Sequence, residues 1–409
     1  MKKRVVITGM EITSAIGTGL EAFWHAATHG LSGIKRIQAY DPSPYTTQIA
    51  GEITDLSLDA LPEFNKSKRY PKAARYALYC AHHAIASSGL TSSELAHAGT
   101  FIGSSLGGYP ELETAYSSFF TDSWKKMPPL TVIRGMPNSV ANYIAIAFGI
   151  GGPNSTFSNA CVSSAEAIGS AYQQITAGML STAVCGGTES LVWESVMAAW
   201  CKLRVMSTHN EQPEQACRPF AADRDGLVMA DGAGIIVLEE LEHAKARGAN
   251  ILAEIIGYGA SCDATHITAP DTAGQIRAIK QALDNARLSV DDVQYINAHG
   301  TGTQLNDRTE TQTIKALFAE HAYAIPINAQ KSMTGHAIGA AGVMDIIATA
   351  LTLQHNIIPP TINLAHADSC CDLDYVANKA RNKEVDIALS NHFAFGGANA
   401  ALLMQKYRG

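Results

Sequence analysis

Residues 157–165 read FSNACVSSA, and they pass from a β-like run through small residues into an alanine-rich stretch at 163–177. Similar changes from a short β-rich run to a helical stretch recur along the whole chain, as is typical of layered α/β folds. Strands are expected at residues 4–8, 100–102, 182–185, 234–238, 251–259, 295–297, 387–389 and 400–404. Helices are expected at residues 20–29, 72–88, 139–148, 163–177, 273–286, 307–318 and 342–355.

The length of 409 residues predicts two domains or one large fused core. The best internal boundary lies near residue 250, because a helix carrying residues 239–247 ends at Gly248 and a new β run starts at Ile251. This pattern predicts an N-terminal half at 1–250 and a C-terminal half at 251–409.

Composition excludes several classes of protein. A formal net charge of −7 argues against general nucleic-acid binding, which usually shows a basic footprint. The longest apolar stretch, at 337–353, is interrupted by Asp345, so no membrane span is expected. Eight cysteines occur without a C-x-x-C or any zinc-like Cys/His spacing, which predicts no metal site. The first residues lead directly into a strand, so we expect no signal peptide and a cytoplasmic protein.

One segment is strongly basic despite the acidic total. Five cations fall within ten residues of a loop that leads into a helix: Lys66, Lys68, Arg69, Lys72 and Arg75. Two interpretations remain open. The segment is either a solvated helix start or a docking patch for an acidic partner, because a basic patch on an acidic protein steers such partners.

Cys161 is the first candidate catalytic residue. At the start of a helix, a thiol meets unpaired N–H groups and the positive end of the helix dipole, which lower its pKa. The same N–H groups can stabilise an oxyanion after the thiol attacks a carbonyl. A buried, inert cysteine in a well-packed turn remains the alternative.

Two histidines lie in loops made of small residues. His299 lies in NAHGTGT at 297–303, and His336 lies in KSMTGHAIGAAG at 331–342. Neutral imidazoles in such pockets can donate to a thioester carbonyl or an enolate oxygen. Each alone could equally be structural, but a cysteine and two histidines with the same loop character suggest acyl-transfer chemistry.

A third segment reads SNHFAFGGANA at residues 390–400. Two aromatic residues before a double glycine suggest a hinge that moves the rings. An ordinary β-turn with two core aromatic residues is the alternative.

These segments together resemble the elongating β-ketoacyl-[acyl-carrier-protein] synthases of type II fatty-acid and polyketide assembly. Further matching motifs are RVVITGM at 4–10, GGTES at 186–190, RPF at 218–220, DRDG at 223–226, DGAG at 231–234, PPTINL at 359–364 and CDLDYV at 371–376. The likeness covers nearly the whole chain. It implies a thiolase-like, five-layered αβαβα fold of two similar halves, usually as a dimer.

The resemblance also implies roles for single residues. Cys161 would be the nucleophile, and its backbone N–H with that of Phe395 would form the oxyanion hole. His299 and His336 would promote decarboxylation of a malonyl group, supported by Lys331 and Glu310. Thr301 and Thr303 would contact the phosphopantetheine arm, and Phe393 would gate the site with Phe395. Leu106, Ile133 and Met197 are candidates for lining the acyl tunnel.

The implied reaction is a decarboxylative Claisen condensation that needs no metal or organic cofactor. Some relatives hold a structural cation, for which Asn297, Asp345 and Ser390 are candidates. The implied partners are an acidic acyl carrier protein and either a second copy or a chain-length-factor-like subunit. For carrier docking, Lys202 and Arg204 would join Lys66, Lys68, Arg69 and Lys72.

Several positions depart from the usual pattern of this family. Val162-Ser163 follows the cysteine, Gln330 precedes the lysine, Ala394 replaces the glycine between the gate aromatics, and Tyr70-Pro71-Lys72 stands where an aspartate-containing pattern is common. These differences fit a specialised secondary-metabolite pathway. The main alternative is a non-catalytic chain-length-factor-like subunit, against which Cys161 and both histidines argue. An asparagine in place of His336 would mark an initiating synthase, and a cysteine in the C-terminal run would mark a thiolase.

Overall fold

The computed structural model describes residues 2–58, 61 and 70–409, and two groups of five strands dominate it. The N-terminal group has the order β1-β8-β7-β5-β6, and the C-terminal group has the order β9-β15-β14-β10-β11. The N-terminal strands are β1 (Val5–Ser14), β5 (Gly99–Gly103), β6 (Asn154–Phe157), β7 (Thr182–Glu189) and β8 (Gly232–Glu240). The C-terminal strands are β9 (Ala253–Cys262), β10 (Tyr295–Asn297), β11 (Ile327–Asn328), β14 (Ile387–Phe393) and β15 (Ala398–Gln405).

The two groups repeat the same pairing directions. In the first, β5 pairs in parallel with β6 and β7, while β7–β8 and β8–β1 are antiparallel. In the second, β10 pairs in parallel with β11 and β14, while β14–β15 and β15–β9 are antiparallel. The halves join where residues 5–7 of β1 pair with residues 253–255 of β9. The predicted two similar halves are therefore confirmed.

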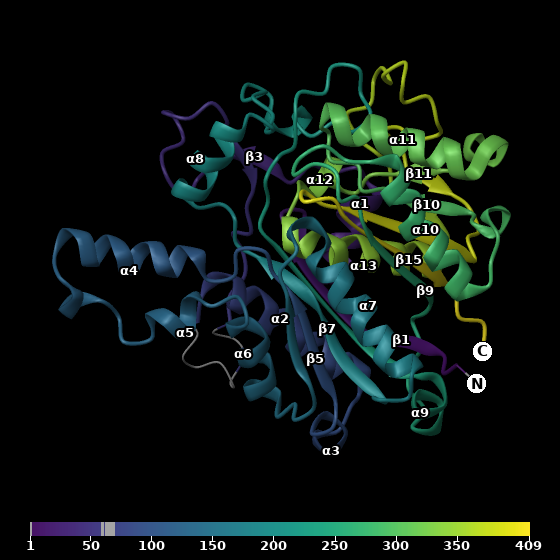
Figure 1. Cartoon of the computed structure of the whole chain (residues 1–409), viewed down its shortest axis with the longest axis horizontal. Helices are drawn as coiled ribbons and strands as arrows, with labels where there is room; N and C mark the ends of the chain where they lie inside the picture. The colour runs from purple at the N-terminus through teal and green to yellow at the C-terminus, as the bar shows by residue number, and fades with distance from the viewer. Residues whose placement is uncertain (1, 59–60, 62–69) are drawn as a thin grey trace.

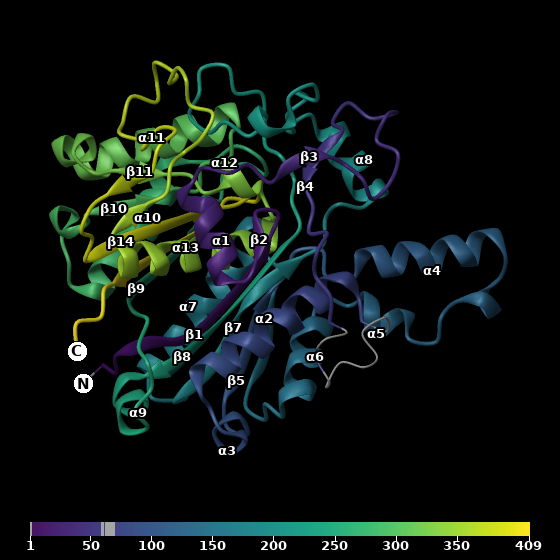
Figure 2. The ribbon, with the colours of Figure 1, turned by 180° about the vertical axis from the view of Figure 1, so that it is seen from behind.

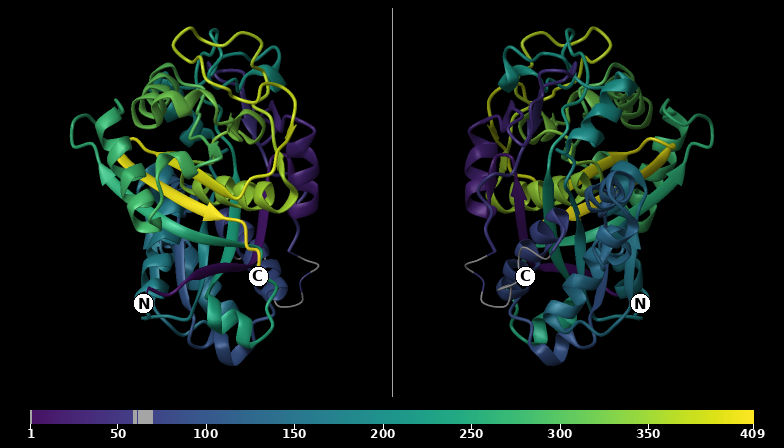
Figure 3. Two further views of the ribbon diagram at one scale, coloured as in Figure 1. Left: turned by 90° about the vertical axis from the view of Figure 1, so that its right-hand side faces the viewer. Right: turned by 90° about the vertical axis from the view of Figure 1, so that its left-hand side faces the viewer.

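Helices form three further layers. The middle layer holds α7 (Ser163–Thr176) and α13 (Ala341–His355), which contact each other and both groups of strands. The N-terminal strands carry α2 (Lys72–Ser88) and α6 (Ser139–Phe148) on their outer face, and the C-terminal strands carry α10 (Thr272–Ala286), with α11 (Gln304–Phe318) packed beside it. Figure 3 shows the mostly green and yellow C-terminal half above the blue and teal N-terminal half. This arrangement confirms the αβαβα expectation.

Helix α13 owes its central position to its sequence. It is mostly apolar, with Asp345 as its only charged residue before the last turn, and every residue from Ala341 to Leu353 is buried. The sequence analysis expects no membrane span. The stretch Ile338–His355 nevertheless has the length and composition of one, but 89% of it is buried inside the protein. Among the described residues, the one apolar helix of spanning length therefore forms core.

Close backbone contact allows α7 to lie against the sheet. A Cβ on Gly103 of β5 would lie 2.2 Å from the backbone nitrogen of Ser164, well inside van der Waals contact. A glycine at this position therefore brings the start of α7, and with it Cys161, directly over the carboxyl end of β5.

The remaining elements are shorter. The helices are α1 (Leu20–Thr28), α3 (Ser92–Leu95), α4 (Tyr109–Thr121), α5 (Thr131–Gly135), α8 (Glu194–Leu203), α9 (Leu241–Ala246) and α12 (Lys331–Thr334). The strands are β2 (Gly17–Thr18), β3 (Ile34–Arg36), β4 (Ile49–Gly51), β12 (Ile357–Ile358) and β13 (Arg381–Asn382). Figure 2 shows α1 from behind, beside α13, and α4 standing away from the body.

All eight predicted strands and seven predicted helices are present. The sequence did not predict α4 or α8. The helix expected at 239–247 begins only at Leu241, because residues 239 and 240 continue β8. Helix α11 begins three residues before the expected start, because the Thr303 side chain accepts from the backbone nitrogen of Asn306 and caps it.

Candidate active site

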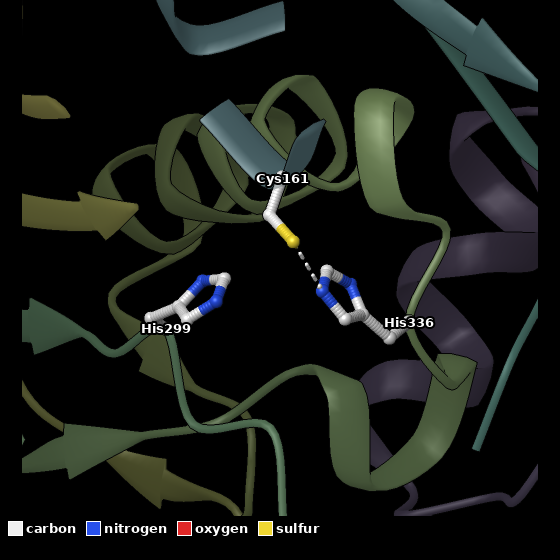
Figure 4. A group of neighbouring side chains, drawn as sticks. All are labelled: Cys161, His299 and His336. Carbon is white, nitrogen blue, oxygen red and sulfur yellow. Dashed lines mark hydrogen bonds between the residues drawn. The ribbon is translucent and has the colours of Figure 1, made fainter. Parts of the chain in front are cut away.

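Cys161 lies in a single helical turn, Ala160–Val162, directly before α7. Ala160 has φ 45°, a left-handed conformation that is uncommon for a residue with a side chain. The side chain of Cys161 is 6% exposed and points between two imidazole rings (Figure 4). The sharp turn thus presents the thiol at the inner end of a cavity.

His336 occupies the related position in the other half of the fold, just before the turn that leads into α13. Its Nε2 lies 3.1 Å from the Cys161 Sγ. The backbone of His336 pairs with a neighbouring segment, since its nitrogen donates to the Val228 oxygen at 2.7 Å. Gly335 precedes it at φ 72°, where a Cβ would come within 3.0 Å of that same oxygen. This loop therefore has little freedom to move.

His299 approaches from the loop after β10. Its ring centroid lies 5.4 Å from that of His336, and the two planes are nearly perpendicular at 83°. The Glu310 carboxylate on α11 accepts from the backbone nitrogens of His299 and Gly300, both at 2.8 Å. The structure therefore brings the predicted cysteine and both histidines together, and Glu310 holds the backbone of one of them.

Burial dominates the electrostatics of this group. It raises the pKa of the Cys161 thiol to about 12, against the lowering effects of Lys331 and of the backbone N–H groups of Phe395 and Cys161. The expected lowering of this pKa by the helix start is therefore wrong in direction, because removal of the thiolate from water outweighs it. Burial also lowers the pKa of His299 and His336 well below the usual value, and Lys331 adds to this effect. Both imidazoles are neutral at pH 7.

Lys331 is itself buried and bound by an ion pair. Its Nζ lies 2.6 Å from the Asp345 Oδ2 on α13. The pKa of Asp345 is raised, because burial outweighs the nearby ammonium. The sequence marked Asp345 as a charge within an apolar run and as a candidate ligand of a structural cation, and the ion pair explains the buried charge. Since Lys331 already neutralises this carboxylate, the Asp345 part of the suggested cation site is occupied by an ammonium group.

A cavity of about 290 Å³ opens from the thiol to the surface. Its lining includes the expected residues Thr301, Thr303, Phe393 and Phe395, together with Cys161, His299 and His336. Trp200 of α8 also lines it and stacks on Phe395, with ring centroids 6.0 Å apart and planes at 21°. Sequence reasoning missed Trp200, since nothing in its surroundings distinguishes it from a core aromatic residue.

Comparison with known proteins assigns the family. Residues 2–244 match the family described as "Beta-ketoacyl synthase, N-terminal domain", and residues 252–365 match "Beta-ketoacyl synthase, C-terminal domain". The chain belongs to the β-ketoacyl synthases. It is thus a condensing enzyme of the acyltransferase class, as the resemblance implied.

Relatives of this β-ketoacyl synthase match over its full length. It is 39% identical to 3-oxoacyl-[acyl-carrier-protein] synthase 2 of Synechocystis sp., covering 100% of this chain and 99% of that protein. The solved ishigamide ketosynthase/chain length factor is 32% identical with a TM-score of 0.92, covering 100% of both chains. A ketosynthase bound to a hexaketide, in complex with its type II polyketide acyl-carrier protein, is 28% identical with a TM-score of 0.90 and the same coverage.

The candidate tunnel residues of this β-ketoacyl synthase do not all lie together. Met197 is fully buried and belongs, with Cys161, to one apolar cluster, against which the half-buried Leu106 packs. Neither Leu106 nor Met197 is among the residues that line the cavity, although Cys161, Leu227 and Ile338 of the same cluster are. Ile133 lies on α5 with 51% of its surface exposed, outside that cluster.

The candidate docking residues also have different surroundings. Lys202 and Arg204 are exposed, and Arg204 lines the cavity mouth. Lys72 instead pairs with the buried Asp231 at 2.7 Å, so its charge is partly neutralised. Lys66, Lys68 and Arg69 lie outside the described residues.

Proposed function

We propose that this chain joins an acyl group held on Cys161 to a malonyl unit by decarboxylative Claisen condensation, with both substrates carried on phosphopantetheine arms of acyl carrier protein. One observation carries this proposal. The Cys161 Sγ lies 3.1 Å from the His336 Nε2 and faces His299, at the inner end of a cavity that opens to the surface. A nucleophile, two neutral donors and a channel for a flexible arm are the parts that this reaction needs.

The first half-reaction would acylate the thiol. The raised pKa keeps Cys161 protonated at rest, so its proton has to leave as the sulfur attacks, and His336 is within reach to accept it. Attack on the acyl thioester forms the new C–S bond and an oxyanion. The backbone N–H groups of Cys161 and Phe395 point toward the sulfur and can receive this charge. The carrier thiol then leaves with the proton.

The second half-reaction would form the carbon–carbon bond. As the malonyl thioester loses carbon dioxide, its electron pair moves onto the thioester oxygen as an enolate. A neutral imidazole carries one N–H, which His299 can donate to this oxygen; His336 can donate as well in the tautomer that has its proton on Nε2. The enolate carbon attacks the acyl carbonyl, and the Cys161 sulfur leaves as a thiolate that takes up a proton from water. The product is a β-ketoacyl thioester on the second carrier.

Burial of the charged groups supports these roles. Lys331 and Asp345 form a closed pair beneath the histidines, which favours the neutral imidazoles without exposing a free cation to the substrate. Thr301 and Thr303 line the cavity and hydrogen-bond each other at 3.0 Å, in a place suited to the amide groups of a phosphopantetheine arm. We propose no separate cofactor.

The same proposal includes the partners. A solved relative in complex with its acyl-carrier protein favours carrier docking at the cavity mouth, where Arg204 lines the cavity and the nearby Lys202 adds exposed positive charge. The ishigamide ketosynthase/chain length factor favours assembly with a second chain of the same fold, either identical or chain-length-factor-like. We also propose that the boundary between the two halves lies near residue 250 and that the protein is cytoplasmic.

The alternative is a chain-length-factor-like subunit without catalytic activity. A non-catalytic subunit does not require a cysteine, two histidines and a buried lysine placed close together. All four are present here. The condensing reaction therefore accounts for more of the site.

The test measures β-ketoacyl product from acyl-carrier and malonyl-carrier substrates. We expect product from the native chain and none from Cys161→Ala. His299→Ala should retain acylation but lose decarboxylation of the malonyl group. Product from Cys161→Ala at the native rate would refute the proposal. If the native chain is inactive, adding a chain-length-factor-like partner distinguishes a missing subunit from a non-catalytic role.

A further inference from the structure

The Cys161 sulfur and one ring nitrogen from each of His299 and His336 form a compact group of three atoms. They all lie within 4.8 Å of one another, and each of the three residues is buried. In the part of the chain that the structure describes, this is the only group of three or more cysteine, histidine or acidic side chains with such spacing.

The chemistry of these atoms matches a transition-metal site. One thiolate and two imidazoles are ligands that Zn²⁺ prefers, with Zn–S near 2.3 Å and Zn–N near 2.0–2.1 Å. Tetrahedral coordination at these lengths separates ligand atoms by about 3.3–3.6 Å. The Cys161–His336 separation of 3.1 Å is already close to this value. A shift of about 1 Å in a side chain would complete the set.

The surroundings of the three atoms leave room for a cation. The nearest cation, Lys331, is neutralised by Asp345 at 2.6 Å. The adjoining cavity supplies an entry path and room for water as a fourth ligand.

We propose that Cys161, His299 and His336 form an inhibitory site for Zn²⁺ and similar divalent metals in the unacylated protein. Binding replaces the thiol proton by the metal, so one proton is released for each ion bound. The metal occupies the sulfur lone pair that attacks the acyl thioester, and acylation in turn removes the thiolate ligand. Metal binding and acylation therefore exclude each other, and the ion is an inhibitor rather than a cofactor.

The first test uses Co²⁺ alone as a spectroscopic probe, with no carrier or acyl substrate present. We expect a near-ultraviolet thiolate-to-cobalt charge-transfer band that saturates at one ion per chain and disappears on addition of Zn²⁺. Cys161→Ser should abolish the band, and His336→Asn should weaken Co²⁺ binding at least about tenfold. Circular dichroism of each variant shows whether it is folded.

The matched control removes the two exposed cysteines, Cys262 and Cys370, by Cys262→Ser/Cys370→Ser. This variant should keep the band, whereas loss of the band there would overturn the proposal. A second measurement follows alkylation of single cysteines by iodoacetamide. Zn²⁺ at ten times its Kd should slow alkylation of Cys161 about tenfold while leaving Cys262 unaffected.

Besides loss of the band in that control, three results would overturn the proposal: no band in the folded native chain, a band that survives Cys161→Ser, or alkylation of Cys161 that Zn²⁺ does not slow. Because neither measurement needs a condensing substrate, failure here leaves the proposed reaction untouched. A native chain that binds Co²⁺ through Cys161 but stays inactive even with a chain-length-factor-like partner would instead refute only the reaction.

Discussion

Replacing Lys331 by methionine isolates the buried ion pair beneath the active site. The variant Lys331→Met keeps most of the side-chain volume and removes the ammonium that lies 2.6 Å from Asp345, where both side chains are almost completely buried. Breaking a buried pair by removing one partner costs about 3–5 kcal/mol, because the remaining charge is left in a medium of low dielectric constant. We expect a loss of this size in the free energy of unfolding at pH 8.

The loss should depend on pH in a defined direction. Burial raises the pKa of Asp345, and Lys331 is the cause that lowers it, so the variant raises it further. A carboxyl whose pKa is higher in the folded state favours folding at low pH, and this contribution is lost as pH rises through the folded pKa. The deficit of Lys331→Met should therefore shrink as the pH falls toward 5.

Urea denaturation followed by tryptophan fluorescence measures both effects. The control variant Lys331→Met/Asp345→Leu replaces the whole pair with apolar groups and should recover stability to within about 1 kcal/mol of the native chain. Alkylation of Cys161 should be slower in this double variant than in the native chain, because Lys331, which lowers the pKa of that thiol, has been removed. A deficit below about 1 kcal/mol for the single variant, or a double variant as unstable as the single one, would refute this reasoning.

Four further predictions concern single positions. Burial raises the pKa of Glu310 to about 7, so deprotonation of this carboxyl opposes folding as the pH rises. Between pH 4 and pH 8 the native chain should therefore lose about 3 kcal/mol of unfolding free energy that Glu310→Gln keeps. Parallel stability–pH profiles for the two proteins would contradict this. Gly103→Ala should destabilise by at least about 2 kcal/mol in urea, because its Cβ would overlap the backbone of Ser164; a neutral effect would show that α7 can move. Ala394→Gly should cost up to about 1 kcal/mol but speed acyl transfer in stopped flow, and an unchanged rate would argue against a hinge at this residue. Alkylation of Cys161 should rise about tenfold per unit from pH 7 to 9 without a plateau, since burial raises its pKa to about 12; a plateau below pH 9 would mean a lower pKa.

Much of the fold follows from sequence periodicity. Most strands and the long helices of both halves were predicted, because many of the strands are apolar runs and the helices repeat their apolar positions, but the short edge strands β6 and β11 were not. Helix α4 was missed because it buries only Pro110 and Ala115, so no apolar face marks it. Local sequence patterns also do not predict the matching strand order of the two halves, because that order depends on pairing between distant segments.

The candidate site was predictable in membership but not in electrostatics. Cys161, His299 and His336 were recognised by their small neighbours, which leave space for substrate. The direction of the Cys161 pKa shift could not be predicted, because it depends on how completely the folded chain buries the sulfur. Nor could the sequence show that Lys72 pairs with Asp231, 159 positions away. Such pairings arise only when segments that are distant in the sequence fold against each other.

The most direct test of the account asks where the acyl group resides. The native chain, Cys161→Ala and the surface control Cys262→Ala are incubated with acyl-carrier protein alone, digested and analysed by mass spectrometry. The account predicts one acyl adduct in the native chain and in Cys262→Ala, on the peptide that contains Cys161, and none in Cys161→Ala. An adduct that persists in Cys161→Ala, or one found on another residue of the native chain, would contradict the assignment of Cys161 as the nucleophile.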